Sequence, residues 1–206
     1  MSLLTGDALI FCLNFNNTDN WLAARATREF ARTTQYPVRC IPCIGSLGNV
    51  ARDSASRDDP LAAYKARRAE ARQKFATREL ERNCEMLGIT TDQGSRQTSS
   101  VSAARGLATL VQSHASEDDC WRYIEAVFTA HFLGARNIAS ESVVTELLGT
   151  DLTQSETDLQ AIQSTLEDAG IFNTPSYLFG GERFHGRQHL PLIRWQIEGR
   201  AGLPPV

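Results

Sequence analysis

The sequence predicts an α/β fold in which a β-α-β half and a β-β-α half flank a long helical block. A short apolar run of strand length, ALIFCLNF, is followed by a helical pattern and then by a second β-rich run. In the middle of the chain, apolar residues recur at the intervals typical of helices. Near the C-terminus, PSYLFGGERFHG reads as two short strands around Gly180-Gly181, which is typical of a hairpin, and a helix follows.

The first helix follows a polar break at residues 16–20. The segment WLAARATREFARTT repeats apolar residues every four positions, which indicates one buried stripe: Leu22, Ala26 and Phe30. Asp19 or Thr18 is expected to cap this helix, because short polar side chains can accept a hydrogen bond from its first free N–H groups.

The second strand is predicted in YPVRCIPCIG, which ends at Gly45. Pro37 and Pro42 favour an edge or irregular strand, because proline has no N–H to donate to a neighbouring strand. Two strands joined through a helix in this way form a parallel pair with a crossover.

The helical block begins with a long helix from about residue 60 to 87, for which Gly88 supplies a C-cap. Further helices are predicted at about 101–114, 117–133, 140–148 and 155–169. The complete order of elements is that of a thioredoxin-like fold with a large helical insertion. We expect residues 1–50 and 170–206 to form the thioredoxin-like core and residues 51–169 to form the inserted domain.

Composition narrows the class of protein. The 206 residues are 42% hydrophobic and carry a net charge of −3, so nothing draws the chain as a whole toward nucleic acid. No apolar run approaches the ~20 residues that span a membrane, and no secretory signal is recognisable at the N-terminus. Five scattered cysteines do not suggest a secreted disulfide framework. We therefore expect a cytoplasmic protein.

The most specific stretch is GIFNTPSYLFGGERFHGRQHLPLIRW. It resembles the C-terminal signature of the DsbA-like family that contains 2-hydroxychromene-2-carboxylate isomerases and kappa-class glutathione transferases. Three other segments resemble family motifs in the same order: FNNTDNWLA, SLGNV and RQKFATRELERNCEMLGI. The resemblance covers nearly the whole chain and implies the same thioredoxin-like fold, with glutathione as a cofactor and a homodimer as the assembly.

A CIPC motif at residues 40–43 looks like a redox pair. In redox-active relatives such a motif lies at the N-terminus of the first helix, where the helix dipole lowers the thiol pKa. Here that position reads NNTDN, and CIPC falls in the second strand. Three strand residues span ~10 Å and the two side chains point to opposite faces, whereas a disulfide needs Cα atoms within ~7 Å. A structural role for Cys40 and Cys43 is favoured unless Pro42 kinks the strand.

The resemblance also implies a thiol site. Thr174-Pro175 matches the family's cis proline, whose preceding backbone pairs with an extended thiol peptide. Asn17 takes the place of the serine that lies near the glutathione thiol, and Thr18 takes that of a proline. An asparagine amide can donate to a thiolate, but Asn17 and Thr18 would equally serve as helix caps.

Other positions follow from the same motifs. Asn49 matches an asparagine that contacts glutathione, and Arg72 matches a lysine that faces its glycyl carboxylate, although a solvated helix face explains this basic run equally well. Gln188 and His189 replace an aspartate and an arginine; the aspartate binds the γ-glutamyl ammonium in relatives.

The substrate pocket is expected beside Trp21 and His185, where relatives place large aromatic groups. His114 and His131 have no partners at metal-ligand spacing, so no metal site is predicted.

Three functions follow as hypotheses. The first is a glutathione-dependent isomerase or transferase acting on a small aromatic molecule. The second is a non-catalytic member that binds a thiol or a peptide, since the family's serine and its acid-arginine pair are both replaced. The third and least favoured is a thiol-disulfide oxidoreductase that uses CIPC.

Overall fold

The computed structural model describes residues 4, 6–44, 61–150, 152 and 157–205. Its strands and longer helices follow the predicted order. In sequence order the elements are β1 (Leu9–Leu13), α1 (Thr18–Thr34), β2 (Val38–Pro42), α2 (Ala62–Leu87), α3 (Thr91–Gly94), α4 (Val101–Gln112), α5 (Glu117–Phe128), η1 (Thr129–Leu133), α6 (Glu141–Leu148), α7 (Leu159–Asp168), β3 (Ser176–Phe179), β4 (Glu182–His185), η3 (Arg187–His189) and α8 (Leu190–Ile197).

A four-stranded sheet of order β2-β1-β3-β4 forms the centre of the molecule. β1 runs parallel to β2 and antiparallel to β3, and β3 forms the predicted hairpin with β4. β2 lies at the edge, as its prolines predict, because an edge strand tolerates a missing N–H. This arrangement confirms the predicted α/β fold with helices inserted between its two halves.

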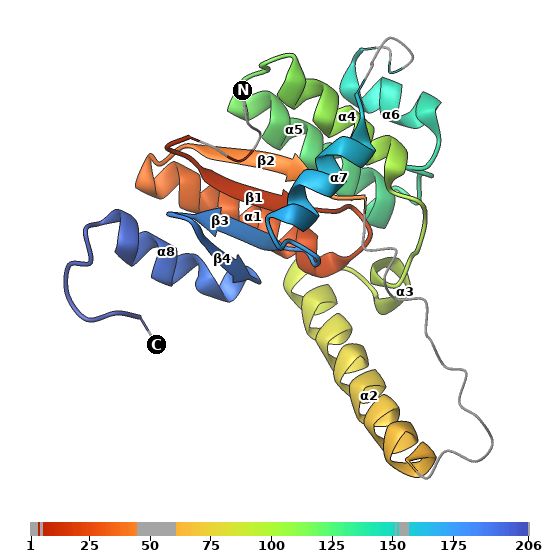
Figure 1. Cartoon of the computed structure of the whole chain (residues 1–206). Helices are drawn as coiled ribbons and strands as arrows, with labels where there is room; N and C mark the ends of the chain where they lie inside the picture. Colours follow the sequence, from red (N-terminus) through yellow and green to blue (C-terminus); the bar gives the residue numbers. More distant parts are fainter. Residues whose placement is uncertain (1–3, 5, 45–60, 151, 153–156, 206) are drawn as a thin grey trace.

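Side chains of β1 alternate between two hydrophobic clusters, one on each face of the sheet. Leu9, Phe11 and Leu13 pack with α1, α5 and α8. Ile10 and Cys12 pack on the opposite face with α7. Figure 1 shows α7 in front of the sheet and α1 behind it. All five β1 residues are buried because helices cover both faces.

The inserted helices share the core of the sheet. The Phe11 ring stacks against Trp121 of α5 at 6.2 Å and against Tyr177 of β3 at 5.2 Å. α4 contributes Leu107 to the first cluster and Ala108 to the second. Aromatic burial of this kind, strengthened by ring packing, joins the insertion to the sheet.

α2 differs from the other long helices because it projects away from the sheet (Figure 1). Nearly all of its side chains are exposed, and buried residues occur only toward its C-terminal end, at Asn83 and Cys84. Gly88 ends the helix with φ +69°, as predicted. A Cβ on Gly94 of α3 would lie 2.3 Å from Cys84 Sγ, so this end of α2 is anchored tightly.

Two local predictions differ from the structure. The cap of α1 is Asn17 and not Thr18 or Asp19, and capping was one of the two roles expected of Asn17. The helix predicted at 117–133 changes to a π-helical turn at Thr129. The four-residue α3 was not predicted, because an element this short has no periodicity.

Candidate functional site

The N-terminus of α1 is organised by asparagine side chains. Asn17 has an extended backbone, and its Oδ1 accepts from the backbone N–H of Asn20 at 2.9 Å and from Asn20 Nδ2 at 2.8 Å. Asn20 is fully buried. The carbonyl end of Asn17 is thus committed to capping the helix, which leaves its Nδ2 as the end that can donate to a ligand.

The same asparagines hold the loop that precedes β3. The Thr174–Pro175 bond is cis, as the resemblance implies. Thr174 Oγ1 accepts from Asn14 Nδ2 at 2.7 Å and from Asn20 Nδ2 at 3.2 Å. The fold therefore brings Asn17 and Thr174 to one place from opposite ends of the chain.

A small cavity of about 150 Å³ lies where these elements meet. Its wall includes Asn14, Asn17, Cys43, Gln163, Phe172 and Thr174. The cavity is below the ~300 Å³ at which drug-sized ligand sites begin. A thiol-bearing side chain fits inside it, and the remainder of a larger ligand would lie outside.

Thr18 and Trp21 do not line this cavity. Thr18 is buried with its methyl group toward Gly94. The Trp21 ring stacks with Phe128 at 6.0 Å and Phe132 at 5.6 Å, and only 3% of the residue is exposed. The structure therefore places Trp21 in the core between α1 and η1.

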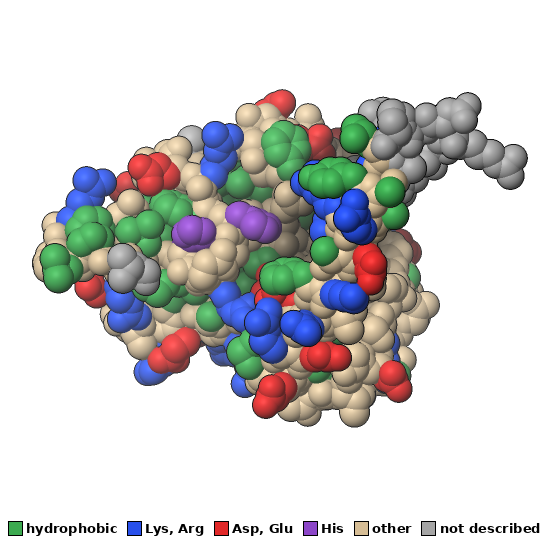
Figure 2. Space-filling view, turned by 90° about the horizontal axis from the view of Figure 1, so that it is seen from below, with side chains coloured by type: hydrophobic (Ala, Val, Ile, Leu, Met, Phe, Trp, Pro, Cys, Tyr) green, Lys and Arg blue, Asp and Glu red, His purple; other side chains and the backbone are tan. Residues whose placement is uncertain are grey.

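The predicted residues after β3 lie beside the cavity rather than on its wall. Gln188 Nε2 donates to the His185 carbonyl at 2.8 Å. His185 Nδ1 is 3.1 Å from Ser176 Oγ, and the His189 ring packs near Phe184 at 5.7 Å. Figure 2 views the face on which histidine side chains lie close to one another, bordered mainly by hydrophobic side chains and by atoms drawn in tan.

An ion pair that was not predicted links this region to α1. Arg187 donates to Asp19 in the first turn of the helix. Burial raises the pKa of the Asp19 carboxyl above its ordinary value, and Arg187 and His185 oppose this rise. Asp19 was expected only as a cap, and nothing in the sequence signals its distant partner.

Arg72 and Asn49 are not brought to the cavity. Arg72 is exposed on α2, and its Nε contacts the Arg68 carbonyl at 3.4 Å. Asn49 lies outside the described residues.

The five cysteines are all buried and none forms a disulfide. Cys40 packs with Phe11 on one face of the sheet, and Cys43 packs with Ile10 and Cys12 on the other. The opposite orientation predicted for CIPC is therefore confirmed. Burial raises the pKa of the Cys40 thiol well above its ordinary value, so this thiol is inert near neutral pH.

Cys43 belongs to the cavity, which the sequence reasoning missed. A signal existed, because Cys43 directly follows β2, and the adjacent end of β1 leads to Asn17. Asn14 and Asn20 were also missed. Within the run NFNNTDN only Asn17, Thr18 and Asp19 were given roles, although its density of amides after a buried strand indicates a hydrogen-bonded cluster.

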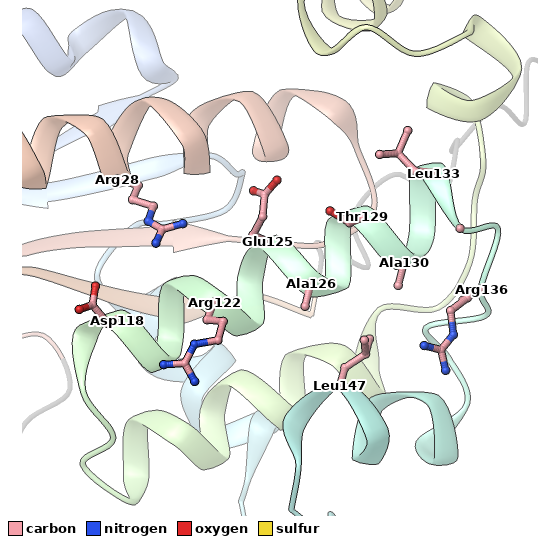
Figure 3. A pocket seen from close by; sticks show the side chains of 11 residues that line it. Arg28, Asp118, Arg122, Glu125, Ala126, Thr129, Ala130, Leu133, Arg136 and Leu147 are labelled. Carbon is pink, nitrogen blue, oxygen red and sulfur yellow. The ribbon is translucent and has the colours of Figure 1, made fainter.

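A larger, open groove of about 960 Å³ lies elsewhere on the surface. Figure 3 shows Arg28 reaching from α1 toward α5, with Leu147 of α6 on the far side. Arg122 and Arg136 on its wall are already paired with Asp119 and Glu146. None of the predicted site residues lines the groove.

Two features are absent from the part of the chain that the structure describes, a metal site and a membrane-spanning helix. No group of three or more His, Cys, Asp or Glu side chains is placed to bind a metal ion. No described helix combines the length and apolar character needed to cross a membrane.

Comparison with known proteins supports the architecture. No protein-family model matches the sequence, and no curated protein matches it significantly. Solved structures do match. A 2-hydroxychromene-2-carboxylate isomerase has a TM-score of 0.60 at 16% identity, over 94% of this chain and 95% of the other.

Two further structures carry redox names. A "putative protein disulfide isomerase" from Nitrosomonas europaea has a TM-score of 0.62 at 15% identity, over 95% of this chain and 98% of that one. A "probable DsbA oxidoreductase" from Streptomyces coelicolor has a TM-score of 0.62 at 13% identity, over 97% and 93%. The chain therefore has the thioredoxin-like fold with inserted helices that these DsbA-like structures share.

Proposed function

We propose that the protein is a glutathione-dependent isomerase or transferase that acts on a conjugated aromatic small molecule. One observation carries the proposal: Asn17 at the N-terminus of α1 and Thr174 before the cis proline face the same cavity. A thiol in this cavity would meet the positive end of the helix dipole, which favours the thiolate.

Individual groups suit the cysteinyl part of glutathione. Asn17 Oδ1 is held by Asn20, and Asn17 Nδ2 has no partner among the described residues, so it can donate to the sulfur. No described residue pairs with the backbone N–H or carbonyl of Thr174, so both are available to an extended thiol peptide. The thiolate would add reversibly to the conjugated substrate, and rotation about the bond that becomes single would isomerise it. A cytoplasmic homodimer is part of this proposal.

A non-catalytic thiol or peptide binder is the second candidate. Two observations favour it: Asn17 offers no hydroxyl, and the cavity has no room for an aromatic substrate beside a thiol. The third hypothesis, a redox role for CIPC as a pair, loses its support because Cys40 and Cys43 lie on opposite faces of the sheet.

Binding of reduced glutathione tests the premise. We expect calorimetry at millimolar concentration to give heat, and thermal unfolding to shift upward in proportion to occupancy. Neither heat nor a shift would remove the cofactor from the proposal.

Initial rates on a hydroxychromene carboxylate, at saturating glutathione, test catalysis. A hydrogen bond to a charged group contributes ~1.5–3 kcal/mol, and ~1.36 kcal/mol changes a rate tenfold. Asn17→Ser restores a small hydroxyl and still caps α1, so we expect a rise of about tenfold or more. Asn17→Ala should lower the rate.

The three variants separate the two candidate functions. A fully active parent that serine does not improve would show that asparagine replaces the hydroxyl competently. If all three proteins are inert but bind glutathione, the non-catalytic binder is the better description.

A further inference from the structure

Cys43 places a protein thiol inside the proposed thiol site. It follows the last residue of β2, and its backbone N–H donates to the Leu13 carbonyl at 2.7 Å, so its position is fixed by the sheet. Only 5% of Cys43 is exposed, whereas Phe172 on the same cavity is 61% exposed. The cavity therefore connects the buried sulfur to solvent.

Cys12 lies behind Cys43 and contacts it. It is fully buried, and a hydrogen bond to Cys43 together with burial raises the Cys12 pKa well above its ordinary value. Cys12 therefore remains a protonated thiol near neutral pH.

Cys12 is not placed to form a disulfide with Cys43. The register pairs Cys12 with Ile41, so Cys43 is a diagonal neighbour two residues further along. Neighbouring strands lie ~4.8 Å apart and two parallel-strand residues rise ~6.6 Å, which places diagonal Cα atoms ~8 Å apart, beyond the ~7 Å that a disulfide tolerates without backbone movement. With Cys12 at this spacing and Cys40 on the opposite face of the sheet, the thiol partner that suits Cys43 is one that enters the cavity from outside the protein.

Gln163 of α7 gives independent evidence that the cavity is built for a ligand. It lines the cavity and is 9% exposed, and its Nε2 donates to Glu167 Oε1 at 2.9 Å. An ionised carboxylate only accepts, so Glu167 fixes which way the amide points. Gln163 Oε1 is then buried without a hydrogen-bond partner among the described residues.

An unpaired buried carbonyl costs ~1–3 kcal/mol, and this cost is relieved when a ligand donates a hydrogen bond. The cavity thus offers a sulfur at one position and an acceptor for an amide N–H at another. A cysteinyl peptide carries both complementary groups.

We propose that Cys43 is a thiol-exchange site that forms a mixed disulfide with a small cysteinyl peptide, whose amide N–H donates to Gln163 Oε1. The inference rests on the proposed thiol binding and adds a covalent step to it. The Cys43 thiolate attacks one sulfur of oxidised glutathione, the S–S bond of that disulfide breaks, and one glutathione leaves as a thiolate that takes a proton. The proton lost by Cys43 passes to solvent.

Intact-mass spectrometry after incubation with oxidised glutathione tests the proposal. The parent should gain one glutathionyl group, removable by dithiothreitol and mapped to the peptide that carries Cys43. Cys40→Ser is the matched control, since Cys40 belongs to the same motif but faces away, and it should react like the parent. Cys43→Ser and Cys43→Ala should gain nothing. Gln163→Leu should react about tenfold more slowly, as one lost hydrogen bond predicts.

Calorimetry with reduced glutathione on the same proteins separates this inference from the proposed function. If the parent binds reduced glutathione but forms no adduct, the role of Cys43 is overturned and the proposed function stands. If it shows neither, both are overturned. An adduct that maps to another cysteine, or that persists in Cys43→Ser, also overturns the inference.

Discussion

The cavity beside α1 and the projecting part of α2 were both assigned to the site by the same family resemblance, yet the fold treats them differently. At the cavity, Asn17 and Thr174 are joined through Asn20 by buried hydrogen bonds. On α2, Arg72 is exposed and contacts only its own helix. A residue at the end of a paired strand is placed by backbone hydrogen bonds, whereas a residue on a helix anchored at one end depends on packing that sequence motifs do not specify.

The largest expected contrast is between substitutions of two buried asparagines, one beside the cavity and one in α2, measured as the loss in free energy of unfolding. Asn20 Nδ2 donates to Asn17 and Thr174, and Asn20 Oδ1 accepts from the Asn14 N–H. Each buried group left unpaired costs ~1–3 kcal/mol, so Asn20→Leu should lower the free energy of unfolding by about 3 kcal/mol or more.

Asn83, at the anchored end of α2, is the matched control. It is equally buried, but its Oδ1 has no partner among the described residues. Asn83→Leu should change the free energy of unfolding by less than about 1 kcal/mol, because little is lost with an unpaired group. Denaturant unfolding of both variants measures the contrast. Equal losses in the free energy of unfolding would show that the asparagine cluster stabilises the fold no more than Asn83 does at the anchored end of α2.

Two ion pairs provide a smaller contrast that depends on pH. Arg187→Leu removes the partner of the partly buried Asp19 and should cost about 1 kcal/mol at neutral pH, a figure that allows for solvent screening. The folded pKa of Asp19 lies above its ordinary 3.8, so the folded state favours the protonated carboxyl, and stability falls as pH rises through that pKa. The cost of Arg187→Leu should therefore shrink as the pH falls through the folded pKa of Asp19, because a protonated carboxyl no longer attracts the guanidinium.

Arg82→Leu on α2 is the control for this measurement. Arg82 pairs with Glu79 three residues earlier on an exposed surface. Its removal should cost less than about 0.5 kcal/mol. A pH series of urea unfolding distinguishes the two pairs, and a loss for Arg187→Leu that does not change with pH would contradict the assigned role of Asp19.

The smallest expected effect is at Arg72. Arg72→Glu reverses a charge on the exposed part of α2, and we expect the dissociation constant for glutathione to change less than about twofold. Calorimetry at physiological ionic strength makes the measurement. A weakening of tenfold or more would mean that Arg72 reaches the ligand after all, as the resemblance implied.

The fold could be predicted because its signals are local and periodic. The continuous apolar run of β1, the Gly180-Gly181 turn and the long helical patterns each carry their own evidence. The π-helical turn at Thr129 could not be predicted, because it preserves the apolar pattern of a helix while changing its hydrogen bonds. The sequence also could not predict that α2 projects from the sheet, because its composition is that of any solvent-exposed helix.

Residues of the site could be predicted only where a sequence motif indicates a particular backbone conformation. Thr174-Pro175 is such a motif, and its cis bond was expected. Cys43 and Gln163 were missed because each reaches the cavity through the packing of separate elements, β2 and α7, on one face of the sheet. The ion pair of Asp19 with Arg187 was missed for the same reason.

The most direct test of the account is an NMR titration of the amide-labelled protein with reduced glutathione. The account predicts that the largest chemical-shift changes occur at amides of residues 14–20 and 171–176, around Asn17 and Thr174, with residues 64–78 of α2 unchanged. Changes confined to α2, or to the groove along α5, or no change at millimolar glutathione, would contradict the assignment of the cavity as a thiol site.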